Sequence, residues 1–441
     1  MISVEELYEL YKKCSGITTD SRQIKEGVMF FALKGEKFDG NDFAEDALKA
    51  GAKYAIVDRF LLEGTAYKGR KCIVVQDSLA MLQKLASYHR RQFDIPVVGI
   101  TGTNGKTTTK ELVSAVLAKS YNLVATQANF NNHIGVPLTL FRFDEHTEMA
   151  VVEMGASAPG EIAELTQIVQ PTCGLITTVG KAHLQGFGSF EGVKKTKGEL
   201  YDHLRQKGGM VFYNADNPNL CEMVSFRPGL CTRKYGVKEQ GVRILPATAE
   251  SPYLTLEMEQ DGSTVTIATH LIGDYNADNV MAALAVGNYF HVPFRRMVEA
   301  IEAYTPSNSR SQLVKTERNT LIIDAYNANP SSMKAALNNF AGTDFSDKVL
   351  MLGDMLELGE DSAAEHLAVL EQAVATAPTV FLVGKEFSDA ARVLKDAKAT
   401  VLSFPDIESL KAHVTEHPLS GCTILIKGSN GKHMPRIVDA L

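Results

Sequence analysis

One short stretch, residues 97–111, constrains the fold of this chain more than any other. It reads Val-Val-Gly-Ile-Thr-Gly-Thr-Asn-Gly-Lys-Thr-Thr-Thr-Lys-Glu. A β-branched run typical of a buried strand comes first, two glycines follow, and apolar residues then recur at helical spacing. A strand, a Gly-rich turn and a helix aim backbone N–H groups and the positive end of the helix dipole at one point. The stretch therefore predicts a phosphate-binding loop.

The residues of this loop define a candidate nucleotide site. The loop has the short form G-x-x-G-K-T, because Ile100 stands where the longer nucleotide-loop pattern has its first glycine. Lys106 is expected to reach the β- and γ-phosphates, and the hydroxyl of Thr107 to ligate the Mg²⁺ that accompanies them. The alternative, a Gly-rich turn with a surface lysine, is weakened by the strand and helix on either side. We expect ATP to be bound here by Gly102, Thr103, Asn104, Gly105, Lys106, Thr107 and Thr108.

Length and composition are typical of a multi-domain globular protein. A chain of 441 residues is too long for one ordinary core. Hydrophobic residues at 45% and charged residues at 22% are ordinary proportions. A formal net charge of −7 and the lack of a basic run argue against a nucleic-acid partner. No apolar run approaches the roughly 18 residues that a membrane span requires.

The N-terminal segment and the cysteines predict a cytoplasmic location. Residues 1–13 carry three glutamates and no apolar centre, which does not fit a signal peptide. The six cysteines, at positions 14, 72, 173, 221, 231 and 422, form no C-x-x-C pair. We therefore expect reduced thiols rather than disulfides, and no zinc site.

The order of strand-like and helix-like segments predicts an α/β protein of three domains. Residues 1–94 are expected to form a small α/β domain. Residues 95–305 predict a P-loop mononucleotide-binding domain with a mostly parallel sheet, because strands and helices alternate along it. Residues 306–441 predict a second, doubly wound Rossmann-like sheet without a phosphate loop of its own.

Three local signals refine this prediction. Asp261-Gly262 separates two strand-like runs and favours a β-hairpin. A helix opened by Pro159 is expected to run to Val169. Ser362-Ala-Ala-Glu365 fits a capping box at the start of another helix.

Polar side chains follow several of the expected strands of the central domain. Glu153 ends one strand beside the phosphate loop, where it is either a Mg²⁺ ligand or a loop carboxylate. His183 follows the next strand and either ligates a second metal or has a structural role. Lys197 lies on the helix after it, where a solvated basic face is the simplest interpretation. Asn276 and Asn279, at a helix start, either read an adenine edge or cap the helix.

Further candidates lie in the two outer domains. Arg310 lies in the junction at residues 307–311, from which a guanidinium can clamp phosphate when domains close. Asp324 ends a strand and is followed by Asn327 and Asn329, which predicts a ligand facing the phosphate loop. In the first domain, Ser21, Arg22 and Lys34 either hold an anion such as a diphosphate or belong to ordinary turns.

These motifs together resemble the Mur ligase family over essentially the whole chain. The resemblance rests on Asp20-Ser21-Arg22, Phe30-Phe31-Ala32-Leu33-Lys34-Gly35, Phe38-Asp39-Gly40, Gly102-Thr-Asn-Gly-Lys-Thr107, Asn129-Phe130-Asn131-Asn132-His133-Ile134-Gly135-Val136-Pro137, Glu153-Met154-Gly155, Ala182-His183-Leu184, Tyr326-Asn-Ala-Asn-Pro330, Leu352-Gly353-Asp354-Met355 and Lys427-Gly428-Ser429. The Asn-Phe-Asn-Asn and Tyr-Asn-Ala-Asn-Pro stretches are most similar to the members that extend UDP-N-acetylmuramoyl-tripeptide. Mur ligases also carry the short phosphate loop, so Ile100 is no departure from their pattern.

The resemblance implies an ATP-dependent, Mg²⁺-dependent synthesis of an amide bond through an acyl phosphate. It implies that D-alanyl-D-alanine is joined to UDP-N-acetylmuramoyl-tripeptide in peptidoglycan precursor synthesis, by a monomer. The catalytic residues would be Lys106, Glu153, His183 and Lys197, and the metal ligands Thr107, Glu153, His183 and Lys197, the last as a CO₂-derived carbamate. Asn276, Asn279, Arg310 and Asp324 would complete the ATP site. The other substrates would be held by Ser21, Arg22, Lys34, Asn131, Asn132, Asn327 and Asn329.

Two alternatives to this function remain open from the sequence. Within the same class, the chain is another Mur ligase or a folate polyglutamate ligase. In a different class, it is a regulatory module that hydrolyses ATP without joining anything. The third domain, with its own polar strand ends, argues against such a module.

Overall fold

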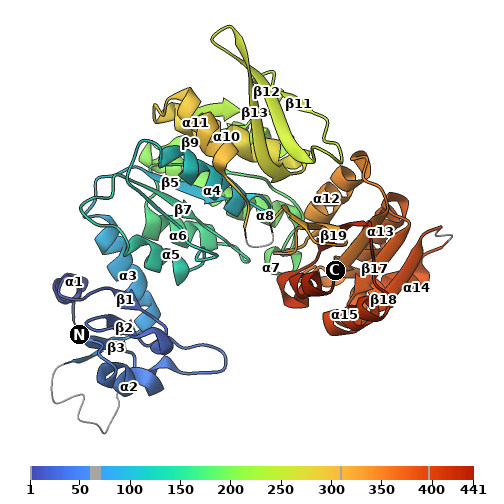
Figure 1. Cartoon of the computed structure of the whole chain (residues 1–441). Coiled ribbons are helices and arrows are strands. Elements are labelled where there is room, and N and C mark those ends of the chain that lie inside the picture. The colour runs from blue at the N-terminus through green and yellow to red at the C-terminus, as the bar shows by residue number, and fades with distance from the viewer. Residues whose placement is uncertain (1, 60–70, 308–309, 396–397) are drawn as a thin grey trace.

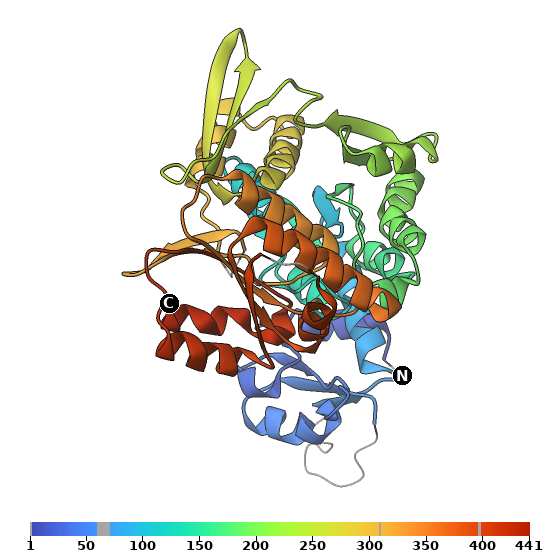
Figure 2. The same ribbon diagram turned by 90° about the vertical axis from the view of Figure 1, so that its right-hand side faces the viewer.

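A computed structural model of the chain describes residues 2–59, 71–307, 310–395 and 398–441. Three domains follow one another along the chain, with the second between the other two (Figure 1). In the view turned by 90°, the N-terminal domain again lies at the opposite end of the molecule from the long β-hairpin of the central domain (Figure 2). The predicted α/β class with three domains is confirmed. Within the described ranges, no helix has both the length and the apolarity that crossing a membrane requires.

The N-terminal domain is built on a 4-stranded parallel sheet in the order β1-β2-β3-β4. Its strands are β1 (Ile17–Thr18), β2 (Met29–Phe31), β3 (Tyr54–Val57) and β4 (Cys72–Val74), and its helices are α1 (Val4–Tyr11), α2 (Ala44–Lys49) and α3 (Ser78–Arg90). Side chains alternate across a strand, so Phe30 and Phe31 of β2 pack into hydrophobic clusters on opposite faces of the sheet.

The central domain contains a 6-stranded parallel sheet in the order β10-β9-β8-β5-β7-β6. Its strands are β5 (Val97–Thr101), β6 (Leu123–Ala125), β7 (Met149–Glu153), β8 (Cys173–Ile176), β9 (Met210–Asn214) and β10 (Cys231–Tyr235). The helices are α4 (Lys106–Leu117), α5 (Gly135–Leu140), α6 (Glu161–Val169), α7 (Leu184–Phe187), α8 (Phe190–Lys207), α9 (Pro218–Ser225), α10 (Ala277–Tyr289) and α11 (Phe294–Ala303). Strands β5 and β7 are buried along their whole length because helices cover both faces.

The order of these strands explains where the site lies. From β5 the chain runs to β6 at one edge, returns through β7, and then crosses to β8 on the other side of β5. This reversal is a topological switch point, at which the loops after neighbouring strands part and leave a crevice. The loops that follow β5, β7 and β8 therefore meet at one place.

A 3-stranded antiparallel sheet extends the central domain. Its strands are β11 (Arg243–Leu245), β12 (Tyr253–Gln260) and β13 (Ser263–Ile272). Asp261 and Gly262, between β12 and β13, have φ values of 51° and 77°. Positive φ at both turn residues suits the right-handed twist of the two strands, so the predicted hairpin is confirmed.

The C-terminal domain has a second 6-stranded sheet, in the order β14-β15-β19-β16-β17-β18. Its strands are β14 (Gln312–Lys315), β15 (Thr320–Ile323), β16 (Lys348–Gly353), β17 (Thr379–Val383), β18 (Thr400–Phe404) and β19 (Thr423–Lys427), and only β14 runs antiparallel to its neighbour. The helices are α12 (Pro330–Gly342), α13 (Ser362–Thr376), α14 (Lys385–Val393) and α15 (Ile407–Glu416). Because β19 pairs with β15, Lys427 at the end of β19 lies beside Asp324.

Two of the local predictions are wrong. Ser362 is not the cap of α13: the cap is Asp361, without a side-chain hydrogen bond, and the Ser362 hydroxyl donates to Glu386 at 2.8 Å. Glu365, the other member of the predicted capping box, instead pairs with Lys181 of the central domain. Pro159 lies before the start of α6, which is capped by Gly160 in a left-handed conformation. In both places a partner distant in sequence, or a preceding turn, decided the helix start.

A buried arginine joins the N-terminal domain to the central domain. Arg90 ends α3, is 6% exposed, and points its guanidinium at backbone carbonyls. It donates hydrogen bonds to the carbonyl oxygens of Phe93, Ile95, Val169 and Gln170, at 2.6 to 3.3 Å. Burial lowers the pKa of Arg90 from its ordinary value, and Asp94 opposes this effect.

Replacing this arginine is expected to destabilise the protein. Arg90→Met keeps most of the apolar stem but leaves the buried carbonyls without a donor, which we expect to cost about 2–4 kcal/mol of unfolding free energy. The exposed neighbour Arg91 is the matched control, and Arg91→Met is expected to change stability by no more than about 0.5 kcal/mol. Chemical denaturation measures both, and equal midpoints for the two variants would contradict the role assigned to Arg90.

Candidate active site

A cavity of about 700 Å³ lies where the carboxyl edges of the central and C-terminal sheets face each other. Most of the candidate residues line it: Thr103, Asn104, Gly105, Lys106, Thr107, Thr108, Asn131, Asn132, Glu153, His183, Asn276, Asn279, Arg310, Asp324, Asn327 and Asn329. Five candidates do not line it: Gly102, Lys197, Ser21, Arg22 and Lys34. The structure therefore brings together the phosphate loop, the strand-end polar residues and the C-terminal domain, but not the N-terminal candidates.

Both glycines of the phosphate loop are required by its geometry. Gly102 has φ of 147°, and a Cβ there would lie 2.0 Å from the Thr177 hydroxyl oxygen. Gly105 has φ of 80°, and a Cβ there would lie 2.7 Å from the side-chain oxygen of Asn279. A larger residue at either position would combine backbone strain with a steric clash.

The loop is held in place by the end of β8. The backbone N–H of Thr103 donates to the carbonyl of Thr178 at 2.8 Å, and that of Asn104 to the Thr178 hydroxyl at 3.0 Å. The Thr177 hydroxyl donates to the Asn104 carbonyl at 2.6 Å. In the next turn, the N–H groups of residues 106–108 begin α4 and have no intrahelical acceptor. These N–H groups can bind an anion.

Lys106 lies at the mouth of this anion site. Its ammonium group donates to the carbonyl oxygens of Gly102 and Thr103, at 2.8 and 3.0 Å. Burial lowers the pKa of Lys106, which Glu153 counteracts and Arg310 reinforces. Burial makes the charged form of Lys106 unfavourable unless an anion lies close by. A bound phosphate would supply that negative charge and stabilise the protonated lysine.

Glu153 is a buried carboxylate whose two oxygens are both engaged. It is 1% exposed and ends β7. One oxygen accepts a hydrogen bond from the Thr107 hydroxyl at 2.9 Å, and the other accepts from the Asn131 amide at 2.8 Å. The arrangement places a hydroxyl and a carboxylate oxygen side by side at the start of α4. Hard oxygen donors of this kind suit Mg²⁺, which also takes ligands from bound phosphates and water.

His183 lies at the same edge, after β8. Its backbone is left-handed, with φ of 50°, and its Nδ1 contacts the carboxylate of Glu357 in the C-terminal domain. Burial lowers the pKa of His183, Glu357 raises it, and the nearby Lys106 and Lys197 lower it further. The net effect favours the neutral imidazole, which is the form that ligates metals.

Lys197 is buried, unlike its two neighbouring lysines in sequence. It is 2% exposed, and its ammonium group is 3.3 Å from the carbonyl oxygen of Ala156. Burial, with Lys106 nearby, lowers its pKa to about 7. Lys195 is exposed, and Lys194 pairs with the carboxylates of Glu191 and Glu222. The expectation of a solvated face therefore holds for Lys195 but is wrong for Lys197.

Asn276 and Asn279 have no side-chain role in capping a helix. The Asn279 amide oxygen accepts a hydrogen bond from the Thr109 hydroxyl at 2.9 Å, and its nitrogen donates to Asn276 at 2.8 Å. Asn276 in turn donates to the carbonyl of Ile272 at 2.8 Å. Both side chains are buried, and they brace α10 against α4 beside the phosphate loop.

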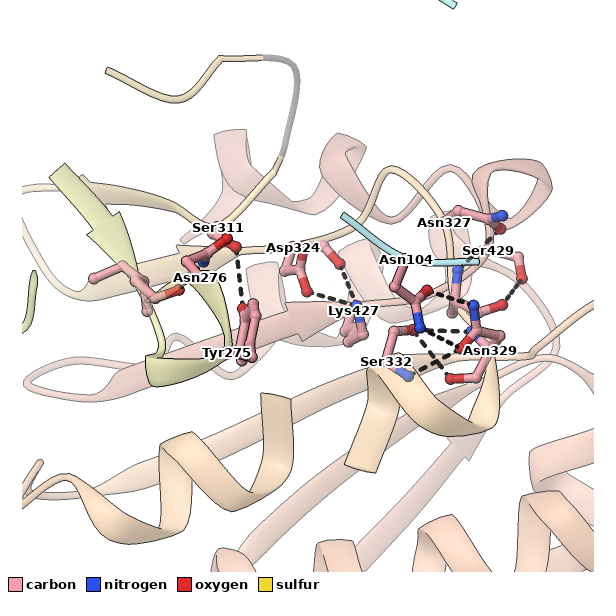
Figure 3. Close-up of polar contacts among 12 residues, drawn as sticks. Asn104, Tyr275, Asn276, Ser311, Asp324, Asn327, Asn329, Ser332, Lys427 and Ser429 are labelled. Atoms are coloured by element: carbon pink, nitrogen blue, oxygen red, sulfur yellow. Dashed lines mark hydrogen bonds and ion pairs between the residues drawn. The ribbon is translucent and has the colours of Figure 1, made fainter. Parts of the chain in front are cut away.

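The C-terminal domain contributes a second polar cluster, drawn in Figure 3. Lys427, which is buried, and Asp324 form an ion pair at 2.5 Å. Asn329 caps α12 and points toward Asn104 of the phosphate loop, to which its amide nitrogen donates at 2.7 Å (Figure 3). The Asn327 amide oxygen accepts from the N–H of Ala328.

Arg310, the candidate from the domain junction, also reaches this cavity. The guanidinium carbon of Arg310 lies 3.6 Å from the centroid of the Tyr326 ring, a cation–π contact that orients the side chain. Residues 308 and 309 of the same junction lie outside the described residues.

The remaining candidates are engaged locally. Arg22 is exposed and pairs with Asp20 at 2.8 Å, and Lys34 pairs with Asp58 at 3.0 Å. Ser21 begins a short 3-10 turn next to Arg22. The Asn132 amide oxygen lies just before α5 and accepts from the N–H groups of residues 134 and 135 at 3.1 and 2.9 Å.

Several residues at the site escaped sequence reasoning. Thr178 lines the cavity and follows a strand, so the strand-end rule that found Glu153 would also have found it. Tyr275, whose hydroxyl is 3.0 Å from that of Ser311, also lines the cavity (Figure 3). Glu357 lies 174 positions from His183, so no local sequence pattern could predict their contact.

Comparisons with known families and sequences agree with this geometry. Three family descriptions match in order: "Mur ligase family, catalytic domain" at residues 13–90, "Mur ligase middle domain" at 100–287, and "Mur ligase, glutamate ligase domain" at 309–430. The UDP-N-acetylmuramoyl-tripeptide--D-alanyl-D-alanine ligase of Bacillus subtilis is 35% identical over 97% of this chain and 93% of its own. The Escherichia coli protein of the same name is 33% identical over 96% and 93%.

Solved structures have the same three-domain fold. MurF from Acinetobacter baumannii superposes with a TM-score of 0.85 at 27% identity, covering 99% of this chain and 98% of that one. MurF from Thermotoga maritima in complex with ADP has a TM-score of 0.84 at 26% identity, covering 98% and 97%. A folylpolyglutamate synthase from Mycobacterium tuberculosis, at 18% identity and a TM-score of 0.62, shares the fold alone. The motifs, the domain order and the near full-length relatives agree: this chain belongs to the Mur ligase family.

Proposed function

We propose that this protein is an ATP-dependent ligase that joins D-alanyl-D-alanine to UDP-N-acetylmuramoyl-tripeptide in peptidoglycan precursor synthesis, in the cytoplasm. The observation that carries the proposal is the single cavity into which the phosphate loop, Glu153 and Asp324 all open. Near full-length relatives that bear the name of this reaction support the choice of substrates. The short Tyr326–Pro330 stretch, which distinguishes this branch in sequence, lies at the same cavity.

The reaction requires two anions to approach each other. The terminal carboxylate of the tripeptide attacks the γ-phosphorus of ATP, ADP leaves, and an acyl phosphate forms. The amine of D-alanyl-D-alanine then attacks the acyl carbon, and inorganic phosphate leaves with the C–O electron pair. Positive charge fixed around the phosphates lowers the barrier to the first step. Lys106, the free N–H groups of residues 106–108 and Arg310 can supply it.

The residues at the loop fit Mg²⁺ through their donor chemistry. Thr107 and Glu153 would hold the ion that accompanies the nucleotide phosphates, because their oxygens already lie side by side. His183, with Glu153 or a carbamate on Lys197, would hold a second ion. When bound, such ions neutralise the charge that develops on the transferred phosphoryl group. Within the described residues no group of three or more His, Cys, Asp and Glu side chains is close enough to hold a metal, so phosphate and water oxygens would complete the coordination.

The outer domains would hold the ends of the two substrates. Residues 1–94 would bind the UDP end through Ser21, Arg22 and Lys34. Because Arg22 and Lys34 are paired with Asp20 and Asp58, a diphosphate would have to displace these pairs. Residues 306–441 would bring in the dipeptide, with Asn327 and Asn329 as candidate contacts. Closure of the domains would exclude water, which hydrolyses an acyl phosphate.

The substrate dependence of ADP release tests this function. ADP release is measured with ATP, Mg²⁺ and UDP-N-acetylmuramoyl-tripeptide, with and without D-alanyl-D-alanine. We expect sustained release only when the dipeptide is present, because its amine consumes the acyl phosphate. Release that is independent of any amine would favour an ATP-hydrolysing module, and release driven by another amino acid would favour a different ligase of the same class.

Replacement of Lys106 is expected to abolish most of this activity. Lys106→Ala removes one fixed donor to the transferred phosphoryl group, so turnover should fall roughly 10²–10³-fold or more while the circular dichroism spectrum is unchanged. Lys119 lies exposed just beyond the other end of the same helix, and Lys119→Ala is the matched control. A near-normal ligation rate in Lys106→Ala would contradict the proposed site.

The lysine carbamate has a pH dependence that follows from the lowered pKa of Lys197. Only the neutral amine attacks CO₂, forming an N–C bond and releasing a proton. Because the pKa is about 7, the neutral fraction rises with pH, and ¹³C-labelled bicarbonate should give a carbamate resonance that grows from about pH 6 to about pH 8. Lys197→Ala should lack this resonance and lose activity, and short carboxylates should partly restore that activity.

Lys195, exposed on the same helix, is the control for this experiment. Lys195→Ala is expected to keep both the resonance and the activity. Full activity of Lys197→Ala without added carboxylate would exclude a required carbamate.

A further inference from the structure

The C-terminal domain reaches across the cavity to touch His183. The loop that follows β16 places the carboxylate of Glu357 against Nδ1 of His183. Beside this contact, the backbone N–H of Gln185 faces the Glu357 carbonyl at 3.5 Å. A second interdomain contact is the ion pair between Lys181 and Glu365 at 2.7 Å. Lys181 is close to His183 in sequence, and Glu365 is close to Glu357. Two charged contacts thus join the loop after β8 to the C-terminal domain, one at Glu357 and one at the start of α13, and only the first involves the histidine.

The backbone at both ends of the His183–Glu357 contact is unusual. His183 has φ of 50° and Glu357 has φ of 64°, and neither residue is a glycine, asparagine or aspartate. A left-handed conformation at such residues persists only where the surrounding structure holds it. The contact between the two side chains therefore depends on two backbone turns that the surrounding structure fixes.

The loop that carries Glu357 is anchored from behind. The carboxylate of Asp354 accepts from the N–H of Phe387 at 2.9 Å. The N–H of Met355 donates to His366 at 3.0 Å, and that of Leu356 donates to the Ser429 hydroxyl at 3.0 Å. Three consecutive residues before Glu357 are thus tied to the body of the C-terminal domain. The Glu357 carboxylate is therefore expected to move together with the C-terminal domain.

We infer that Glu357 is a positioning residue that orients His183 for the ligase reaction when the C-terminal domain docks on the central domain. A carboxylate only accepts hydrogen bonds, so its contact requires the proton of a neutral imidazole to be on Nδ1. The lone pair of Nε2 is then left for a ligand in the cavity that His183 lines. This role rests on the proposed function and deepens it, because it links assembly of the site to domain docking.

The contacts of His183 support this assignment. Among the described residues, no hydrogen bond is formed by Nε2 of His183, whereas Nδ1 is engaged by Glu357. The imidazole also lies near Lys106 and Lys197 of the central domain. A protonated lysine has no acceptor atom, so neither can accept a hydrogen bond from Nδ1–H. The ring packs edge-on against Phe187 of its own domain, but among the described residues its hydrogen-bond partner is a side chain of the neighbouring domain. Partners that hold a metal-binding histidine typically matter 10–100-fold for activity.

Kinetics separate positioning from simple docking. Glu357→Gln keeps the size of the side chain but adds an N–H donor, which permits the other imidazole tautomer. We expect its kcat to fall about 10–100-fold with little change in KM. Glu365→Gln removes the adjacent interdomain ion pair without touching His183, and is expected to leave kcat near that of the wild type. If kcat and KM change equally in Glu357→Gln and Glu365→Gln, Glu357 is only a docking contact and the inference is overturned.

A double substitution sharpens the kinetic test. If Glu357 acts through His183, the variant carrying both His183→Asn and Glu357→Gln should be no slower than His183→Asn alone. Independent, multiplicative losses would overturn the inference.

The tautomer can be observed directly in the full-length protein without nucleotide or metal. The protein is labelled with ¹⁵N at histidine, and the His183 resonances are assigned by their loss in His183→Asn. We expect the Nδ1–H tautomer in the wild type and in Glu365→Gln, and a shift toward Nε2–H in Glu357→Gln. An unchanged tautomer in Glu357→Gln would overturn the inference. Because this measurement needs no turnover, it stays decisive even if the ligase assay fails for all variants, which would instead count against the proposed function.

Discussion

Parallel strands leave their carboxyl ends on one edge of a sheet, and in this protein two such edges face the same cavity. The central sheet directs the loops after β5, β7 and β8 into it because the chain reverses direction across β5. The C-terminal sheet directs the ends of β15 and β19 into it, because β19 is inserted beside β15. No side chain could supply this arrangement alone. The positions of Lys106, Glu153 and Asp324 are consequences of sheet topology.

Buried positive charge is the second constraint on the site. Lys106 is half-buried at the cavity and Lys197 is buried, and desolvation lowers the pKa of each. Within the part of the chain that the structure describes, Lys106 forms no ion pair with a carboxylate and instead donates to loop carbonyls. Lys427, by contrast, is neutralised by Asp324. A site with uncompensated cations favours polyanionic ligands, which agrees with a reaction between a nucleotide phosphate and a carboxylate.

Contacts between domains complete the site. Asn104 of the phosphate loop meets Asn329 at the start of α12, so the loop and the C-terminal helix share a hydrogen bond (Figure 3). The contact of His183 with Glu357 lies at the same interface. Each contact joins a residue of the central site to a residue of the neighbouring domain. A movement of the C-terminal domain would therefore alter the phosphate loop and the histidine together.

Local sequence determined the phosphate loop, the strand ends and the hairpin at Asp261-Gly262, because each depends on φ preferences or on hydrophobic periodicity within a few residues. It also determined that Glu153 ends one strand and that His183 follows the next strand along the chain. Only the tertiary structure decided which lysine of the segment around residue 197 is buried, since periodicity cannot say what covers a helix face. Only the tertiary structure placed Glu365 in an ion pair instead of a capping box, and brought Glu357 to His183, because these partners are 184 and 174 positions apart. Neighbouring residues determine local backbone conformation, whereas burial and long-range contacts arise only when the sheets assemble.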